Sequence, residues 1–394
     1  MICKLTNVIQ NYAWGSHTSL SSLFGFENPE NLPQAELWMG AHPNGGSHVE
    51  ELDTLLVDYI KQHPVKVLGD YTAERYGQLP YLFKVLAAET PLSIQVHPNK
   101  RNSEIGFERE KEQGIALTAP NRNYKDANHK PELVYAITGY KAMNGFRPFE
   151  DILSLFEEVT VQALAPDVEA FMQSPDAKGL QLLFKALLTL EGEKKQQALV
   201  ELSEHYGEMN LSAMAKQALE YSQHFAKLYP SDNGVLAPLI LNIVELQPGE
   251  AMFLHAETPH AYVQGTALEV MASSDNVLRA GLTPKHIDVD ELIANTCFQP
   301  ISPANLLTQP MKREGRLHFP VPVDDFKFDV LEANKIEQSV FVRGAEIVFC
   351  IQGEVCLSAQ GKQVLIRTGE SVLIPFEAQQ FFYHGKGQLA RVSN

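Results

Sequence analysis

Hydrophobic and polar residues alternate strictly in residues 92–97 (LSIQVH). Because alternate side chains of a β-strand share a face, Ser93, Gln95 and His97 form a row opposite the Leu, Ile and Val side chains. Pro98 follows and has no N–H to donate, so it ends the strand. The pattern predicts a strand with one core face and one polar face. That polar face either meets solvent or holds a metal ion and a polar ligand.

Short apolar runs separated by Gly, Pro and Asn continue through the first 150 residues, and runs such as 81–86 and 132–137 predict further strands. From about Phe149 the apolar period becomes that of a helix with one buried face. The clearest example of this period is the set Leu180, Leu183, Phe184, Leu187 and Leu188. We therefore predict a helical insert domain over residues 150–231.

The hydrophobic pattern typical of strands resumes at Asn242. We expect a short helix within residues 284–297. Beyond residue 310, glycines punctuate further expected strands, which cover residues 346–351, 354–358, 363–366 and 371–374. Short, regularly spaced strands with glycine turns are typical of a sandwich or barrel of jelly-roll type. The predicted organisation is a catalytic β-domain over residues 1–149 and 232–309, the insert, and a C-terminal β-domain over residues 310–394.

Composition limits the classes of function. The chain has 394 residues, of which 44% are hydrophobic and 20% charged, as expected for an ordinary globular protein with two or three domains. Its formal net charge of −16 argues against a nucleic-acid partner and against an acidic membrane surface. An anionic substrate would therefore need a local basic cluster.

No stretch approaches the roughly 20 apolar residues of a membrane span, and the first residues show no secretory signal. The four cysteines have neither metal-binding spacing nor the density of a disulfide scaffold. Cys350 and Cys356 could approach across a hairpin, but reduced thiols fit better with the cytoplasmic location that we expect.

Three later segments could join Gln95 and His97. In the first, residues 128–132 (NHKPE), Pro131 favours an extended conformation at Lys130. Lys130 and Glu132 would then share a face, which pairs a cation with a carboxylate that can bind metal. The alternative is a surface loop with two solvated charges.

The second segment, residues 253–262, contains His255, Glu257 and His260. Histidine is a frequent ligand of transition metals. His255 adjoins an apolar run and could be an ordinary core or edge histidine. His260 follows a turn and re-enters a strand, so we prefer His260 as the ligand.

The third segment, residues 267–285, ends a strand in a polar turn and then presents Arg279 and Lys285 beside small residues. These cations are either solvated charges after a capped turn or a grip for phosphate oxygens. A neutral Gln, two neutral His and one Glu around a divalent ion would leave a net charge of about +1, which suits stabilisation of an oxyanion. The absence of thiolates argues against a closed structural zinc site.

With these segments in place, the chain resembles the type I mannose-6-phosphate isomerase (phosphomannose isomerase) family over nearly its whole length. The resemblance rests on residues 10–15 (QNYAWG), 35–43 (AELWMGAHP), 92–100 (LSIQVHPNK), 123–133 (NYKDANHKPEL), 259–262 (PHAY) and 271–285 (MASSDNVLRAGLTPK). It implies a mainly β fold, with cupin-like jelly-roll domains and an inserted α-helical domain.

The resemblance also implies an enzyme with one zinc ion per chain that interconverts mannose 6-phosphate and fructose 6-phosphate. We expect a monomer, although the sequence itself does not set the oligomeric state. The implied zinc ligands are Gln95, His97, Glu132 and His260. The implied phosphate and active-site positions are Ser93, Lys130, Asp275, Arg279 and Lys285, with Lys84 and His129 close by.

A cis-enediol intermediate is the natural route for such an isomerisation. Asp275, Lys130 and His129 are the candidate bases, with the first two preferred. Two other classes compete. A non-catalytic sugar-binding cupin would not need these acid–base residues, and a cupin dioxygenase favours an open iron site of histidines with one carboxylate. The sequence leaves open which metal is used in vivo and what the C-terminal domain does.

Overall fold

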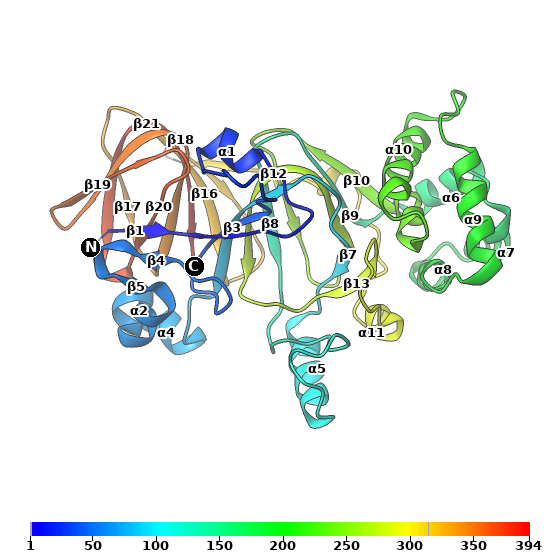
Figure 1. Cartoon of the computed structure of the whole chain (residues 1–394), viewed down its shortest axis with the longest axis horizontal. Helices are drawn as coiled ribbons and strands as arrows, with labels where there is room; N and C mark the ends of the chain where they lie inside the picture. The colour runs from blue at the N-terminus through cyan, green and yellow to red at the C-terminus, as the bar shows by residue number, and fades with distance from the viewer. Residues whose placement is uncertain (1, 314) are drawn as a thin grey trace.

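Two β-sheets lie side by side, and a helical lobe projects from one end (Figure 1). The computed structural model describes residues 2–313 and 315–394. In Figure 1 the C-terminal strands lie on the left and the helices of the insert lie on the right. The sheet between them, called the catalytic sheet below, lies in the middle. The fold is thus mainly β with an inserted helical domain, as the sequence predicted.

The first sheet carries the candidate site and has ten strands among the described residues, with the path β10-β9-β12-β6-β3-β2 and four strands attached to it. Its strands are β2 (Val8–Gln10), β3 (Glu36–Met39), β6 (Tyr81–Ala88), β7 (Ile94–Val96), β8 (Glu132–Ala136), β9 (Tyr140–Phe146), β10 (Leu241–Leu246), β11 (Ala251–Leu254), β12 (His260–Ala272) and β13 (Leu278–Gly281). The long β12 pairs with β6, β7, β8 and β9, so it joins the site's segments.

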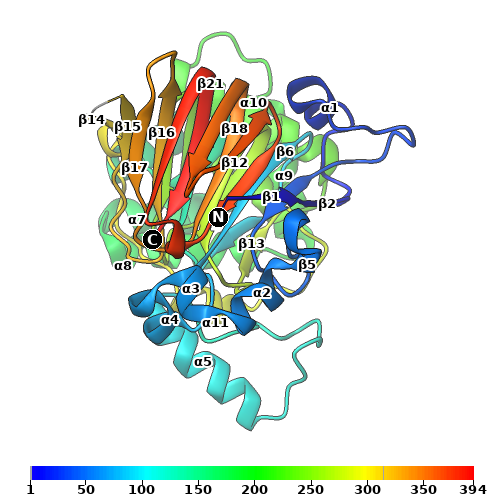
Figure 2. The same cartoon turned by 90° about the vertical axis from the view of Figure 1, so that its left-hand side faces the viewer.

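The second sheet has eleven strands within residues 2–313 and 315–394. They are β1 (Cys3–Thr6), β4 (His48–Val49), β5 (Thr54–Leu55), β14 (Met311–Arg313), β15 (Arg316–Phe319), β16 (Lys327–Ala333), β17 (Gln338–Phe341), β18 (Glu346–Ala359), β19 (Lys362–Arg367), β20 (Ser371–Ile374) and β21 (Gln380–Ser393). Figure 2 views the molecule from the side of these strands.

Strand β6 shows how the core positions the site. Tyr81, Phe83 and Val85 point into an apolar core shared by the two sheets. Burial of each large side chain there contributes about 1.5–3 kcal/mol. The alternate residues of a strand face the other way, so Lys84 lies on the face of the sheet that lines the candidate site. The packed face therefore fixes the position of the functional face.

The N-terminal strands β1, β4 and β5 belong to the sheet of the C-terminal strands. β1 pairs with β20 through Cys3 and Leu373, and it also pairs with β4. Residues 3–6 and 48–55 thus hydrogen-bond to the C-terminal sheet, although the sequence grouped them with residues 1–149 of the catalytic domain. The local pattern of hydrophobic and polar residues does not show which distant strand a given strand pairs with.

The helical insert has its own apolar core, which continues onto β7, β9 and β13. Its helices are α6 (Phe149–Glu158), α7 (Ala165–Gln173), α8 (Ala177–Leu188), α9 (Gly192–Glu204) and α10 (Ala213–Leu228). On α8 the predicted stripe is buried at Leu180, Leu183, Phe184 and Leu187. The Asp176 carboxylate accepts a hydrogen bond from the Gly179 N–H at 2.8 Å and caps this helix.

The other helices flank the sheets: α1 (Ser19–Phe24), α2 (Leu56–Gln62), α3 (Pro64–Leu68), α4 (Asp70–Tyr76), α5 (Lys100–Glu112) and α11 (Val289–Ala294). The last of these lies within residues 284–297, where a short helix was expected. In the part of the chain that the structure describes, no helix has the length and apolar character needed to cross a bilayer.

One prediction in the C-terminal domain was wrong. Residues 346–351 and 354–358 form the single strand β18, with an irregularity between Cys350 and Gln352 instead of a turn. Gly353 has a φ of 87°, and a Cβ there would lie 2.1 Å from the Lys386 carbonyl oxygen. The glycine therefore allows close approach of two strands. Cys350 and Cys356 lie on this same strand, not across a hairpin, and both are free thiols.

Candidate metal centre and sugar-phosphate pocket

His97 follows β7, whose Ile94 and Val96 are buried against the insert's core. The imidazole is only 2% exposed, and its Nδ1 lies 2.7 Å from the Asn276 carbonyl oxygen. A carbonyl can only accept, so Nδ1 carries the proton. The other nitrogen, Nε2, is buried and has no hydrogen-bond partner. A buried lone pair without a partner is what a metal ligand presents before the ion binds.

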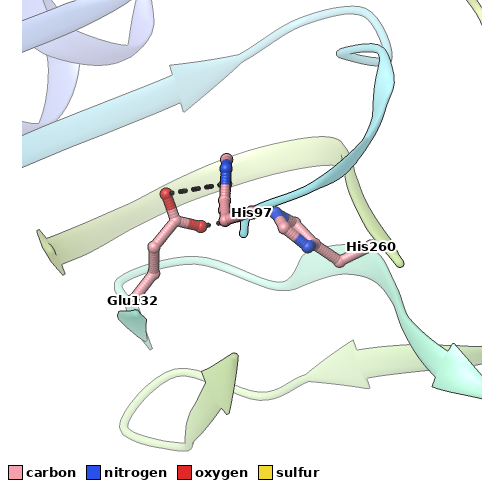
Figure 3. Close-up of side chains that lie close together, drawn as sticks. All are labelled: His97, Glu132 and His260. Atoms are coloured by element: carbon pink, nitrogen blue, oxygen red, sulfur yellow. Dashed lines mark ion pairs between the residues drawn. The ribbon is translucent and has the colours of Figure 1, made fainter. Parts of the chain in front are cut away.

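His260, the first residue of β12, is held in the same way, with its Nδ1 2.9 Å from the Thr258 carbonyl oxygen. Glu132 is the first residue of β8 and lies opposite Met271 of β12. Figure 3 shows His97, Glu132 and His260 converging from three segments. One ligand atom of each lies within 4.8 Å of the other two, and all three residues are buried.

The Glu132 carboxylate is the centre of this group. Its Oε1 lies 3.5 Å from His97 Nε2, and its Oε2 lies 3.4 Å from His260 Nε2. The Lys130 ammonium lies 3.2 Å from Oε1, and the Tyr262 hydroxyl donates to Oε2 at 2.8 Å. The predicted shared face of Lys130 and Glu132 is confirmed.

Electrostatics keep this group in the form that binds metal. Burial, assisted by the Lys130 charge, lowers the pKa of His97 to about 4, so the ring is neutral near pH 7. Burial by itself would raise the pKa of Glu132, but Lys130 and His97 hold that pKa well below its usual range. A neutral imidazole and an ionised carboxylate are the protonation states that metal binding requires.

Gln95 lies next to this group, because β7 pairs Gln95 with His260 on one side and with Arg279 of β13 on the other. Gln95, Glu132 and His260 line a cavity of about 50 Å³. Two imidazoles, a carboxylate and an amide oxygen without thiolates suit zinc in an open site. The residues present therefore fit a divalent ion.

A buried charged row crosses the same face of the sheet. The Lys84 ammonium lies 2.8 Å from Glu269 Oε2 and 3.7 Å from Glu36 Oε1. Burial would lower the pKa of Lys84, but these two carboxylates raise it above its usual value. The pKa of Glu269 is raised by burial despite the Lys84 charge. Lys84 lines the cavity, and protein carboxylates balance its charge.

Sequence reasoning missed Glu36 and Glu269. Each is an acidic residue within an apolar strand, Glu36 at the start of β3 and Glu269 in the middle of β12, and each is fully surrounded by protein. A charged residue in a buried strand is rarely tolerated without a partner. An acidic residue at an apolar strand position was the signal in the sequence that could have identified both glutamates.

Asp275 lies in the loop after β12, and its side chain is 45% exposed. Its Oδ1 lies 3.3 Å from Nε2 of the buried His42. The hydrogen bond from His42 lowers the pKa of Asp275, with Lys130 and Lys84 contributing. His42, another residue that the sequence did not single out, accepts the Asn44 N–H at Nδ1, so its Nε2 donates to Asp275.

Arg279 and Lys285 are the two cations that the sequence assigned to phosphate, and β13 pairs Arg279 with Gln95. Burial lowers the pKa of Arg279, and burial together with Arg279 lowers that of Lys285. Neither side chain has an ion pair among the described residues, so both charges are available to a ligand. Arg279 is half-buried directly opposite Gln95, whereas Lys285 is exposed.

One predicted residue, His129, faces away from this group. The His129 Nε2 lies 3.0 Å from Asp325 Oδ2, in the segment before β16, so its ring faces the C-terminal domain. This follows from alternation, because the neighbouring Lys130 points into the cavity. Ser93 is half-buried just before β7.

Two family models match the chain. One describes the phosphomannose isomerase type I catalytic domain and matches residues 2–149. The other describes the mannose-6-phosphate isomerase cupin domain and matches residues 315–394.

A mannose-6-phosphate isomerase of Escherichia coli is 49% identical over 395 residues, which cover 99% of this chain and 99% of that protein. The crystal structure of mannose 6-phosphate isomerase from Salmonella typhimurium, bound to fructose 6-phosphate and zinc, is 49% identical with a TM-score of 0.94 and covers 100% of this chain and 99% of its own. The human enzyme is 35% identical, over 93% of this chain and 90% of its own length. The chain therefore belongs to the type I phosphomannose isomerase family.

Proposed function

We propose that this protein interconverts mannose 6-phosphate and fructose 6-phosphate with one zinc ion per chain, held by Gln95, His97, Glu132 and His260. The observation that carries the proposal is the buried His97 Nε2, which has no partner and faces the Glu132 carboxylate. Support comes from the relative that binds fructose 6-phosphate and zinc. A bound zinc ion would polarise the sugar oxygens and make the adjacent C–H more acidic.

The reaction needs no external oxidant, because it moves hydrogen only within the sugar. A base takes the proton from C2 of the open-chain aldose while O1 gains a proton, which forms a cis-enediol with a C1–C2 double bond. The O2 proton then leaves and C1 gains a proton, which gives the ketose. The protein must therefore hold one proton near both carbons and stabilise charge on two oxygens.

Lys130 and Asp275 are the two candidate bases that face this site. Lys130 contacts Glu132 inside the cavity, while Asp275 has a depressed pKa and is held by His42 beside it. His129 is the weaker candidate, because its ring is bound to Asp325. Lys130→Ala and Asp275→Asn separate the two. The variant that loses kcat by about 100-fold or more identifies the base, and nearly full kcat in both would contradict the assignment.

Arg279 and Lys285, with Ser93, would hold the phosphate. The phosphate carries nearly two negative charges at neutral pH, and the whole chain carries −16, so local cations must overcome the global field. We expect Arg279→Gln to raise KM by roughly 10- to 100-fold and Lys285→Gln by less, because Lys285 is more exposed. The matched control is Lys178→Gln on α8, an exposed lysine of the insert. An equal rise in KM in the control would contradict the phosphate assignment.

A coupled assay with mannose 6-phosphate, run before and after chelation, tests the proposal as a whole. We expect activity to disappear with the metal and to return with added zinc, because the ion would polarise the sugar oxygens and no other group in the proposal does so. Activity that survives complete removal of the metal would contradict it.

The four free thiols support a reducing compartment, and we place the enzyme in the cytoplasm as a monomer. Analytical ultracentrifugation tests whether the protein is a monomer, and we expect one species near 43.9 kDa. A stable larger species at micromolar concentration would contradict it.

A further inference from the structure

A second cavity opens in the C-terminal β-domain, on strands β15, β16, β17 and β21. Its volume of about 480 Å³ lies within the range of small-molecule sites. In Figure 1, β16 and β17 lie toward the left end of the molecule, whereas β7 and β13 of the metal centre lie to the right of its middle. This cavity is therefore separate from the candidate active site.

The floor of the cavity is a buried polar ladder. Arg391 donates from Nε and Nη2 to both Glu346 oxygens at 2.6 Å, and from Nη1 to Asp329 Oδ2 at 2.5 Å. Asp329 also lies 2.8 Å from His318 Nδ1. The β-sheet register places His318, Asp329 and Arg391 side by side on three neighbouring strands. The carboxylates of the floor are therefore already satisfied by an arginine.

Four more cations line the same cavity without a partner. Arg313, Arg316, Lys327 and Arg343 are among its lining residues. None of them has a side-chain hydrogen bond or an ion pair within residues 2–313 and 315–394. Acidic residues outnumber basic ones by 48 to 32 in this chain. Four cations that have no ion pair among the described residues therefore give this cavity a local excess of positive charge that the overall composition does not predict.

The rim is aromatic. Phe341, the last residue of β17, is 71% exposed. Tyr383 lines the wall and donates its hydroxyl to Gln338. A cationic concavity beside an exposed ring suits a ligand with an anionic part and a flat organic part.

We propose that this cavity binds a small organic phosphate with two or more negative charges, whose phosphate oxygens contact Arg316, Lys327 and Arg343 and whose organic ring lies on Phe341. Guanidinium groups suit phosphate because their N–H donors form paired hydrogen bonds with its oxygens. A metal does not fit, since Arg391 occupies the carboxylates of Asp329 and Glu346. Such a site would give the C-terminal domain a binding role of its own.

Isothermal titration of the zinc-loaded full chain with ADP, and separately with inorganic pyrophosphate, tests the proposal. We expect both to bind, and we expect the double variant Arg316→Gln/Arg343→Gln to weaken both by at least about 10-fold. Phe341→Ala should weaken ADP by about 10-fold and leave pyrophosphate unchanged, because only ADP has a ring to stack. Lys178→Gln, which removes an exposed charge on α8, is the matched control and should change neither.

Three outcomes would overturn the proposal. The first is no heat of binding from ADP or pyrophosphate at about 1 mM, which corresponds to a free energy weaker than about −4 kcal/mol. The second is displacement of ADP by saturating mannose 6-phosphate, which would place its binding at the metal centre. The third is equal weakening by Lys178→Gln and by the double arginine variant. Retained kcat in each variant shows that it is folded.

Discussion

Each β-domain places buried carboxylates on an interior sheet face, and Glu132 of the catalytic sheet differs in its partners from Glu346 and Asp329 of the C-terminal sheet. In the C-terminal sheet, Glu346 and Asp329 are bound by the Arg391 guanidinium at 2.5–2.6 Å. In the catalytic sheet, Glu132 faces two imidazole nitrogens at 3.4 and 3.5 Å, distances too long for good hydrogen bonds. A guanidinium binds the carboxylates of the C-terminal sheet, whereas Glu132, which also contacts Lys130 and Tyr262, faces two imidazole nitrogens without a good hydrogen bond to either.

The difference shows what makes a buried polar cluster a metal site. A permanent guanidinium cannot lose its proton and fills both carboxylates, so no ion can compete with it. Neutral imidazoles whose Nδ1 atoms are held by carbonyls instead leave their Nε2 lone pairs directed at the carboxylate. Among the described residues, no other group of His, Cys, Asp or Glu side chains has the proximity of His97, Glu132 and His260.

Loss of one metal ligand should have the largest effect, on the activity and zinc content of the catalytic domain. We expect His97→Ala to lower kcat/KM for mannose 6-phosphate by about 1,000-fold or more and to lower zinc content, because three ligands cannot hold the ion as tightly. Elemental analysis and the coupled assay measure the two effects. His255→Ala is the control, since His255 is exposed and packs on Phe253. A zinc-replete, active His97→Ala enzyme would refute the ligand assignment.

Removal of Arg391 should destabilise the buried carboxylates of the C-terminal sheet. We expect Arg391→Met to destabilise the protein by about 3–5 kcal/mol, because it leaves two buried carboxylates without their partner. Urea unfolding gives the free energy. Arg367→Gln, which removes an exposed pair with Glu354, should change it by less than about 1 kcal/mol. Folded Arg391→Met should keep its zinc. Stability equal to that of wild type would mean that the carboxylates are not buried as described.

The depressed pKa of His97 predicts a pH dependence. The folded-state pKa of about 4 lies below the ordinary value of 6.5, so the unfolded chain takes up this proton first as the pH falls. The stability of the metal-free protein should therefore decrease from about pH 6.5 to about pH 4, by up to about 3 kcal/mol from this residue. Unfolding free energies of wild type and His97→Gln should converge over that range. Parallel curves would contradict a buried neutral imidazole.

Tyr262 should give the smallest of these effects. Its hydroxyl donates to Glu132 at 2.8 Å, so Tyr262→Phe removes support from a ligand without removing the ligand. We expect zinc affinity to fall by about 10-fold, measured by competition with a chelator. Tyr140→Phe is the matched control, because this neighbouring buried hydroxyl has no hydrogen-bond partner. Equal losses in both variants would show that packing, not the hydrogen bond, matters.

Much of the site was predictable because it lies on local patterns. Alternation in residues 92–97 placed Gln95 and His97 on one face, and Pro131 placed Lys130 with Glu132. The helical period of the insert was equally local. The Glu36–Lys84–Glu269 row was not predictable in this way, because its members come from three strands distant in sequence.

The sequence by itself determined the strand faces, the helical insert, the kind of donor atoms and the family. Each of these depends on residue type and on spacing within one segment. The tertiary structure decided which carbonyls hold the two imidazoles, that His129 faces Asp325, that β1 joins the C-terminal sheet, and that Arg391 closes the second carboxylate group. These depend on strand pairing between distant segments, where many registers suit the local pattern and the packing of the whole core selects one.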